Sequence, residues 1–134
     1  MDRWGCHKTL MLALVCFIIS SLLMYAFAVD KVSGIIWTLI RNLSLSLCGL
    51  TLGKWTVEVY PSDQYGQFGS AGALFASVGG ILAAVFYGFP VDCFKSYRIF
   101  LLWHVAFAAV ALVAVFVVYR RWTSLGGPLN YRAP

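Results

Sequence analysis

Charged side chains are scarce in this sequence. Its 134 residues include 10 Lys and Arg and only 5 Asp and Glu, whereas 61% of the residues are hydrophobic. A water-soluble domain uses about a quarter of its residues as charged groups to cover its core. The composition therefore excludes a soluble globular protein and indicates an integral membrane protein.

Four stretches have almost no charge at all. Residues 9–29, 66–88 and 99–119 carry none, and Ile35–Leu52 is interrupted only by Arg41. A helix needs about 20 apolar residues to cross a bilayer, and none of these stretches shows the alternation of a barrel strand. We expect an all-α membrane protein with four transmembrane helices, at about 9–29, 35–58, 66–88 and 99–119. They form one region over 1–122, and 123–134 is a loose tail.

Patterns of catalytic and metal sites are also absent. The four cysteines have no metal or redox spacing, and no Ser-His-Asp set, phosphate loop, paired carboxylates or metal cluster is visible. We therefore predict no enzyme, no metal and no cofactor. The Lys and Arg residues are scattered and form no basic block, which argues against a nucleic-acid partner.

The distribution of Lys and Arg predicts the topology. One side of the membrane receives six of them and the other receives three (Arg3, Lys8, Lys54, Arg120, Arg121 and Arg132 against Lys31, Lys95 and Arg98). By the positive-inside rule both termini face the cytoplasm, in an inner or plasma membrane. Ala26-Phe27-Ala28 matches a signal-peptidase site, but the apolar run before it exceeds the about 7 to 15 residues of a signal sequence. We expect an uncleaved helix.

The first residues form a charged loop, Asp2-Arg3-Trp4-Gly5-Cys6-His7-Lys8. It resembles the signature of the major facilitator superfamily, which runs Gly, three residues, Asp-Arg, one residue, Gly and then basic residues. Asp2, Arg3 and Gly5 match, and Lys8 keeps one basic position. A carboxylate near a helix N-terminus and cations near helix C-termini complement the helix dipoles, which explains why such a loop braces helix ends.

A second loop strengthens the resemblance. The family has a cytoplasmic connection with Glu, two residues, Pro, three residues and Arg-Gly, and this chain has Glu58, Pro61 and Gly66 in that register. Tyr65 stands where the family has arginine. Both loops fall on the side that the Lys and Arg count makes cytoplasmic.

The resemblance implies that the chain is similar to helices nine to twelve of a twelve-helix transporter. It would then be a fragment or truncated product, inactive alone, of a secondary active transporter for a small polar solute, coupled to H⁺ or Na⁺. Such transporters carry their substrate between two halves. The implied partners are the lipid bilayer, the remaining helices and the solute, with sugars or related metabolites slightly favoured by a hydroxyl-rich face.

That face belongs to the second predicted helix, where polar residues recur at steps of three and four. In the family resembled, the tenth helix borders the central cavity. Arg41 would contact an anionic or hydroxyl-bearing substrate, pair with a carboxylate on another helix, or extend to the nearer headgroups. The substrate-path candidates are Thr38, Arg41, Asn42, Ser44 and Cys48.

The third predicted helix carries small residues at a strict spacing of four. Small residues let two helix backbones approach closely in lipid, so we expect this face to pack on a neighbour and, in a transporter, to rock against it. The residues are Gly72, Ala76, Gly80, Ala84 and Gly88. His104, alone in the fourth helix, is expected to be structural.

A rival interpretation is a self-contained four-helix membrane protein. It would act as an interaction or assembly subunit, or as a small exporter after dimerisation. A small exporter needs a carboxylate inside the membrane to couple protons, and no predicted crossing has one away from its ends. An in-frame upstream extension encoding further apolar helices would favour the transporter.

Overall fold

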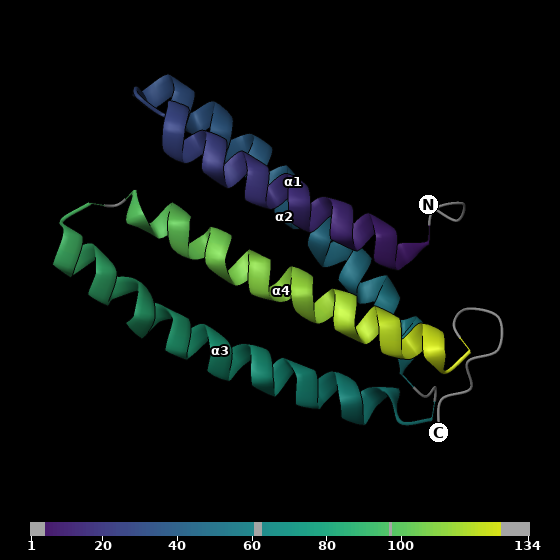
Figure 1. The fold of residues 1–134 in the computed structure, drawn as a ribbon. Coiled ribbons are helices and arrows are strands. Elements are labelled where there is room, and N and C mark those ends of the chain that lie inside the picture. Colours follow the sequence, from purple (N-terminus) through teal and green to yellow (C-terminus); the bar gives the residue numbers. More distant parts are fainter. Residues whose placement is uncertain (1–4, 61–62, 97, 127–134) are drawn as a thin grey trace.

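The chain folds into four long helices. The computed structural model describes residues 5–60, 63–96 and 98–126. Within these residues all regular secondary structure is α-helical, with α1 at Cys6–Phe27, α2 at Lys31–Val59, α3 at Tyr65–Phe94 and α4 at Ile99–Ser124 (Figure 1). All four are long and apolar enough to cross a membrane. The predicted class, an all-α multi-pass membrane protein, is confirmed.

Helix α2 begins four residues earlier than predicted, at Lys31 rather than 35. The reason is a capping box. The Asp30 carboxylate accepts from the Ser33 N–H at 3.0 Å, and the Asp30 N–H donates to the Ser33 hydroxyl at 3.2 Å. This cap satisfies amides that would otherwise lack partners, so only Ala28 to Asp30 separate α1 from α2.

Two other helices run past their predicted ends. Helix α3 continues through Pro90 to Phe94, and Lys95 ends it in the left-handed region at φ 51°. Helix α4 includes Thr123 and Ser124, which the sequence assigned to the tail. Their hydroxyls donate to the carbonyls of Tyr119 and Arg121 at 2.8 and 2.7 Å, which the sequence pattern alone did not reveal. Residues 127–134 of that tail lie outside the described residues.

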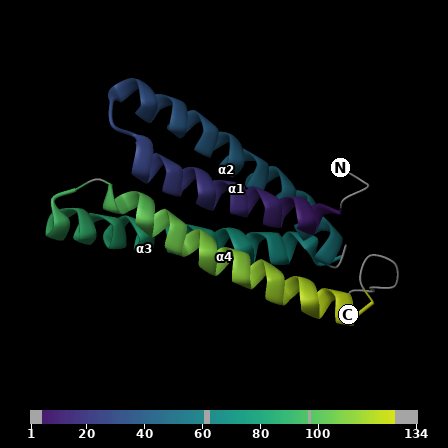
Figure 2. The same ribbon diagram turned by 45° about the horizontal axis from the view of Figure 1, so that its top comes forward.

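The helices pack in the order α2, α1, α4, α3 (Figures 1 and 2). Helix α1 contacts both α2 and α4, and α3 packs on α4 alone. The other pairs touch only marginally, including α2 and α3, although these follow one another in the chain. The first and last helices therefore form the centre of the molecule.

The buried residues follow this order. Along α1 they recur at steps of three and four from Leu10 through Ala13 and Phe17 to Ser20, a spacing that presents one seam to neighbouring helices. The hydroxyls of Ser20 and Ser21 donate to the carbonyl of Phe17 at 3.0 and 2.7 Å, so their burial leaves them satisfied. Among the described residues α3 contributes none, and the rest of the core is Thr51, Trp55, Leu101, Ala108 and Trp122.

The start of α1 meets the ends of α2 and α4. The Cys6 thiol donates to the Thr51 carbonyl at 2.9 Å, and the His7 ring stacks on Tyr119 with centroids 3.9 Å apart. At the opposite end Arg98 donates to the Ala28 carbonyl at 2.8 Å. The first and last described helix ends therefore lie on one side, as an even number of crossings requires.

Candidate functional site

The substrate-path candidates lie together on α2 but differ in burial and in whether their side chains already donate hydrogen bonds. Asn42 is exposed, and the other four are partly buried. The Thr38 hydroxyl donates to the Gly34 carbonyl at 2.8 Å, and the Ser44 hydroxyl donates to the Ile40 carbonyl at 3.3 Å. Both hydroxyls donate to carbonyls of their own helix. The hydroxyl-rich face is therefore less polar than its sequence suggests.

Arg41 is the exception. Its Nε and Nη1 atoms are buried and have no hydrogen-bond partner in the described part of the chain. Its Cζ atom lies 5.9 Å from the centre of the Phe17 ring, within the range of a cation–π contact. Arg41 is ten residues beyond the start of α2, which places it about 15 Å along the helix axis. The guanidinium is therefore held far from either helix end.

The contacts of Arg41 offset only part of the free-energy cost of placing it inside a membrane. An arginine at the centre of a membrane helix costs about 2.5 to 3.5 kcal/mol on insertion scales. A cation–π contact offsets about 0.5 to 2 kcal/mol of that cost. The remainder calls for an anion or for hydrogen-bond acceptors beyond those that the described residues provide.

Aromatic rings connect Arg41 to the other helices. The Phe17 ring that faces Arg41 also meets His104, with centroids 6.1 Å apart. His104 stacks on Tyr87 at 5.5 Å and packs edge-on against Phe100 at 4.2 Å. Together these five residues take one or more members from each of the four helices. We call them the Arg41–His104 cluster: Phe17, Arg41, Tyr87, Phe100 and His104.

The ring of His104 has a defined orientation. Its Nδ1 atom lies 2.9 Å from the Phe100 carbonyl oxygen, one turn earlier in α4. A carbonyl accepts only from a protonated nitrogen, so Nδ1 carries hydrogen in this arrangement. His104 was expected to be structural, and its ring contacts join it to Phe17, the ring that also faces Arg41.

Sequence reasoning named Arg41 as a substrate-path candidate and His104 as structural, and did not single out the other three members of this cluster. A signal was available for Tyr87 and His104, because both are polar aromatic residues inside apolar segments. Phe17 and Phe100 gave none, since phenylalanine is common in membrane helices. That the cluster joins α1, α2, α3 and α4 depends on the packing order, which periodicity does not contain.

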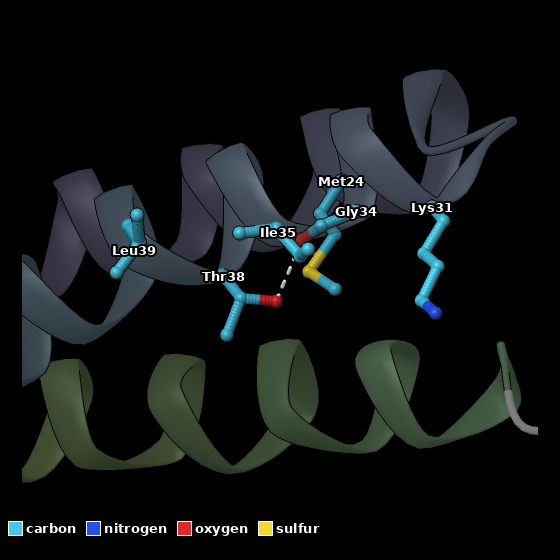
Figure 3. Close-up of a pocket in the computed structure, with 6 residues that line it drawn as sticks. All are labelled: Met24, Lys31, Gly34, Ile35, Thr38 and Leu39. Carbon is cyan, nitrogen blue, oxygen red and sulfur yellow. Dashed lines mark hydrogen bonds between the residues drawn. The ribbon is translucent and has the colours of Figure 1, made fainter.

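A groove lies on the α1–α2 pair near the connection between these two helices. It has a volume of about 380 Å³, and Figure 3 shows the residues that line it, all of them from α1 and α2. Lys31 is its only charged lining residue, and Thr38 stands three residues before Arg41 on α2. The lining residues are Met24, Lys31, Gly34, Ile35, Thr38 and Leu39.

The loop motif falls only partly on described residues. Asp2, Arg3 and Pro61 lie outside them. Gly5 precedes α1 at φ 73°, and a Cβ there would lie 2.9 Å from Cε1 of His7, so this position requires glycine. The remaining members, Lys8, Glu58 and Gly66, are exposed near the beginning of α1, the end of α2 and the beginning of α3.

The small-residue face of α3 has no partner within the part of the chain that the structure describes. All five residues are exposed. A Cβ at Gly72, Gly80 or Gly88 would meet nothing within 4 Å. Close packing by Gly72, Ala76, Gly80, Ala84 and Gly88 therefore stays a prediction, and it requires a helix from outside this chain's described residues.

Other chemistry has little support. Over residues 5–60, 63–96 and 98–126, no group of His, Cys, Asp and Glu is arranged to hold a metal ion. In the Arg41–His104 cluster, a cation with buried nitrogens joins side chains from all four helices. The chain matches no family model, no curated protein and no solved structure.

Proposed function

We propose that this chain is the distal part of a secondary active membrane transporter of the major facilitator type. It would correspond to helices nine to twelve, move a small polar solute together with further helices, and have both termini in the cytoplasm. The two loop motifs support this proposal because they occur in the expected order. Gly5, Glu58 and Gly66 also belong to helix ends on one side of the molecule.

The bare face of α3 is the observation that carries the proposal. Helices in lipid associate through small residues, interhelical hydrogen bonds and shape, since lipid tails are as apolar as the helices themselves. Gly72, Gly80 and Gly88 form such a surface and meet nothing. Helix α2 packs mainly on α1 and touches α3 only marginally. Both features suit a bundle that further helices complete, and a transporter half has six.

A first experiment measures the length of the native polypeptide. An antibody raised against the segment between α2 and α3 is applied to membranes of the source cells. The proposal expects a polypeptide much longer than 134 residues. A native product of 134 residues would contradict it.

A second experiment tests transport in that longer polypeptide. Arg41→Ala should lower solute uptake, normalised to the amount of protein in the membrane, while Arg120→Ala should leave uptake unchanged. Arg120 is the matched control because it is exposed near the end of α4. Equal uptake by both variants would remove Arg41 from the solute path.

An assembly subunit is the competing proposal, and the same bare face of α3 favours it. A partner helix from another protein would then cover Gly72, Gly80 and Gly88. The length measurement separates the two, because a subunit is a polypeptide of 134 residues and shows no uptake of its own. Gly80→Leu would in that case dissociate the subunit from its partner.

A further inference from the structure

We infer that the Arg41–His104 cluster binds the carboxylate of a small organic acid carrying a single negative charge. This inference rests on the proposed function and narrows its solute, which the sequence alone assigned weakly to sugars. It depends on three features of the described residues: buried Arg41 nitrogens without a hydrogen-bond partner, no acidic residue placed near them, and a chain of aromatic rings that begins at Phe17.

The charge of the site selects an anion. At least two nitrogen atoms of Arg41 are buried without an acceptor. The acidic residues that the structure describes, Asp30, Glu58, Asp63 and Asp92, all belong to connections or to the last turns of helices. None is placed to neutralise Arg41. A carboxylate fits a guanidinium in charge and in planar geometry, and the low dielectric of the interior strengthens the pair.

The aromatic rings that begin at Phe17, 5.9 Å from the Arg41 Cζ atom, select the body of the ligand. Phe17 and His104 are in contact, and Tyr87 and Phe100 flank His104. Such walls accept a flat or apolar group and offer few partners to a heavily hydroxylated one. A single guanidinium balances one negative charge, which disfavours phosphate and other dianions. A sugar is also disfavoured, because the Thr38 and Ser44 hydroxyls already donate within α2.

The groove on the α1–α2 pair adds a second cation on the helix that carries Arg41. Lys31 lies at the start of α2 and is the charged residue of this groove, and Thr38 lies one turn from Arg41. A cation ten residues before Arg41 on the same helix raises the local concentration of anions. The lining is otherwise apolar, which suits the same combination of one charge and an apolar body.

The test compares benzoate with benzamide, two probes of the same shape that differ in charge. The native polypeptide is purified in nanodiscs, and ligand affinity and thermal unfolding are measured. We expect benzoate to bind and to raise the unfolding temperature, and benzamide to do neither. Arg41→Gln should weaken benzoate binding by about tenfold or more, the usual consequence of losing a hydrogen bond to a charged group. Arg120→Gln, far from the cluster, should bind as the parent does.

The outcomes are decisive even if Arg41→Gln fails to fold. Equal effects of benzoate and benzamide on the unaltered protein overturn the inference. The same holds if benzoate binding survives Arg41→Gln, or if the partner of Arg41 proves to be a carboxylate on another helix that excludes benzoate. Uptake of a neutral solute with no competition by benzoate would refute the carboxylate site and leave the transporter. Benzoate binding without any uptake would support the site and refute the transporter.

Discussion

Helices α1 and α3 are both apolar and both long enough to cross a membrane, yet they have opposite surroundings. Helix α1 lies between α2 and α4 and buries five residues, whereas α3 buries none of those that the structure describes. The contrast shows that the apolar character of a segment predicts that it crosses the membrane, but not which helices it packs against. In lipid the neighbours are chosen by shape and by polar partners, because the surrounding tails are as apolar as leucine.

The sharpest test of this contrast removes a large ring from each helix. Phe17 is 6% exposed and Phe75 is 80% exposed. Phe17→Ala should lower the free energy of unfolding by about 3 kcal/mol, the low end for a core phenylalanine, since lipid removes part of the hydrophobic term. Phe75→Ala should change it little. Unfolding in mixed micelles titrated with sodium dodecyl sulfate measures both, and similar losses would remove the distinction between the helices.

Adding bulk probes the same difference from the other direction. Ala13, on the seam of α1, is 1% exposed, while a Cβ at Gly80 would meet nothing within 4 Å. Ala13→Leu should cost about 1 to 2 kcal/mol through overpacking. Gly80→Leu should be nearly neutral in the 134-residue chain and disruptive in a longer native polypeptide. Strong destabilisation of the short chain by Gly80→Leu would show that α3 packs within it.

Replacing glycine by alanine at Gly5 or at Gly34 should change stability by a smaller amount. Gly5→Ala places a methyl group against His7 at a positive φ and should cost about 1 kcal/mol. Gly34→Ala has open space in α2 and should stabilise the helix by up to about 1 kcal/mol. Thermal unfolding in one detergent compares them. A shift of the same sign for both would contradict the placement of Gly5.

The connections before α2 and α3 should differ in their response to acid, and this is the smallest expected effect. Hydrogen bonds from Ser33 hold the pKa of the Asp30 carboxyl below its usual value of 3.8, whereas Gln64 makes no side-chain cap for α3. A lowered pKa in the folded state means that the stabilisation is complete above about pH 4 and is lost as the pH falls through the folded value.

Asp30→Asn is the matched variant for that effect, because an amide oxygen still accepts from Ser33 but does not titrate. Unfolding measured from pH 6 to pH 3 should show a decline in the parent and a smaller one in Asp30→Asn. Identical profiles would mean that the Asp30 cap does not contribute to acid sensitivity.

Much of the architecture was predictable because membrane crossing depends on local composition. Residue 99 was correctly placed as the start of the fourth helix, and the end of the second was predicted to within a residue. The start of α2 was wrong because the capping box of Asp30 and Ser33 was overlooked, although both residues are visible in the sequence. The end of α3 was wrong because the helix continues through Pro90 to Phe94, six residues past the predicted end at 88. Boundaries depend on single hydrogen bonds, and apolar runs do not record them.

The candidate site was predictable only in part. Arg41 stands out in any apolar run, since its burial is costly wherever it occurs. Its neighbours did not, because the contacts from Phe17 to His104 and from His104 to Tyr87 join helices far apart in sequence. The hydroxyls of Thr38 and Ser44 illustrate the converse, since they looked available for a sugar and are bonded within their own helix.

The sequence by itself determined that this protein crosses a membrane four times through helices, because every backbone polar group in lipid must be satisfied within its own segment. Only the tertiary structure decided that α1 is central, that α3 buries no described residue, and that Phe17 of α1 lies against both Arg41 of α2 and His104 of α4. Such choices depend on which side chains fit together across helices. The apolar character that identifies a crossing is shared by all four and does not distinguish between them.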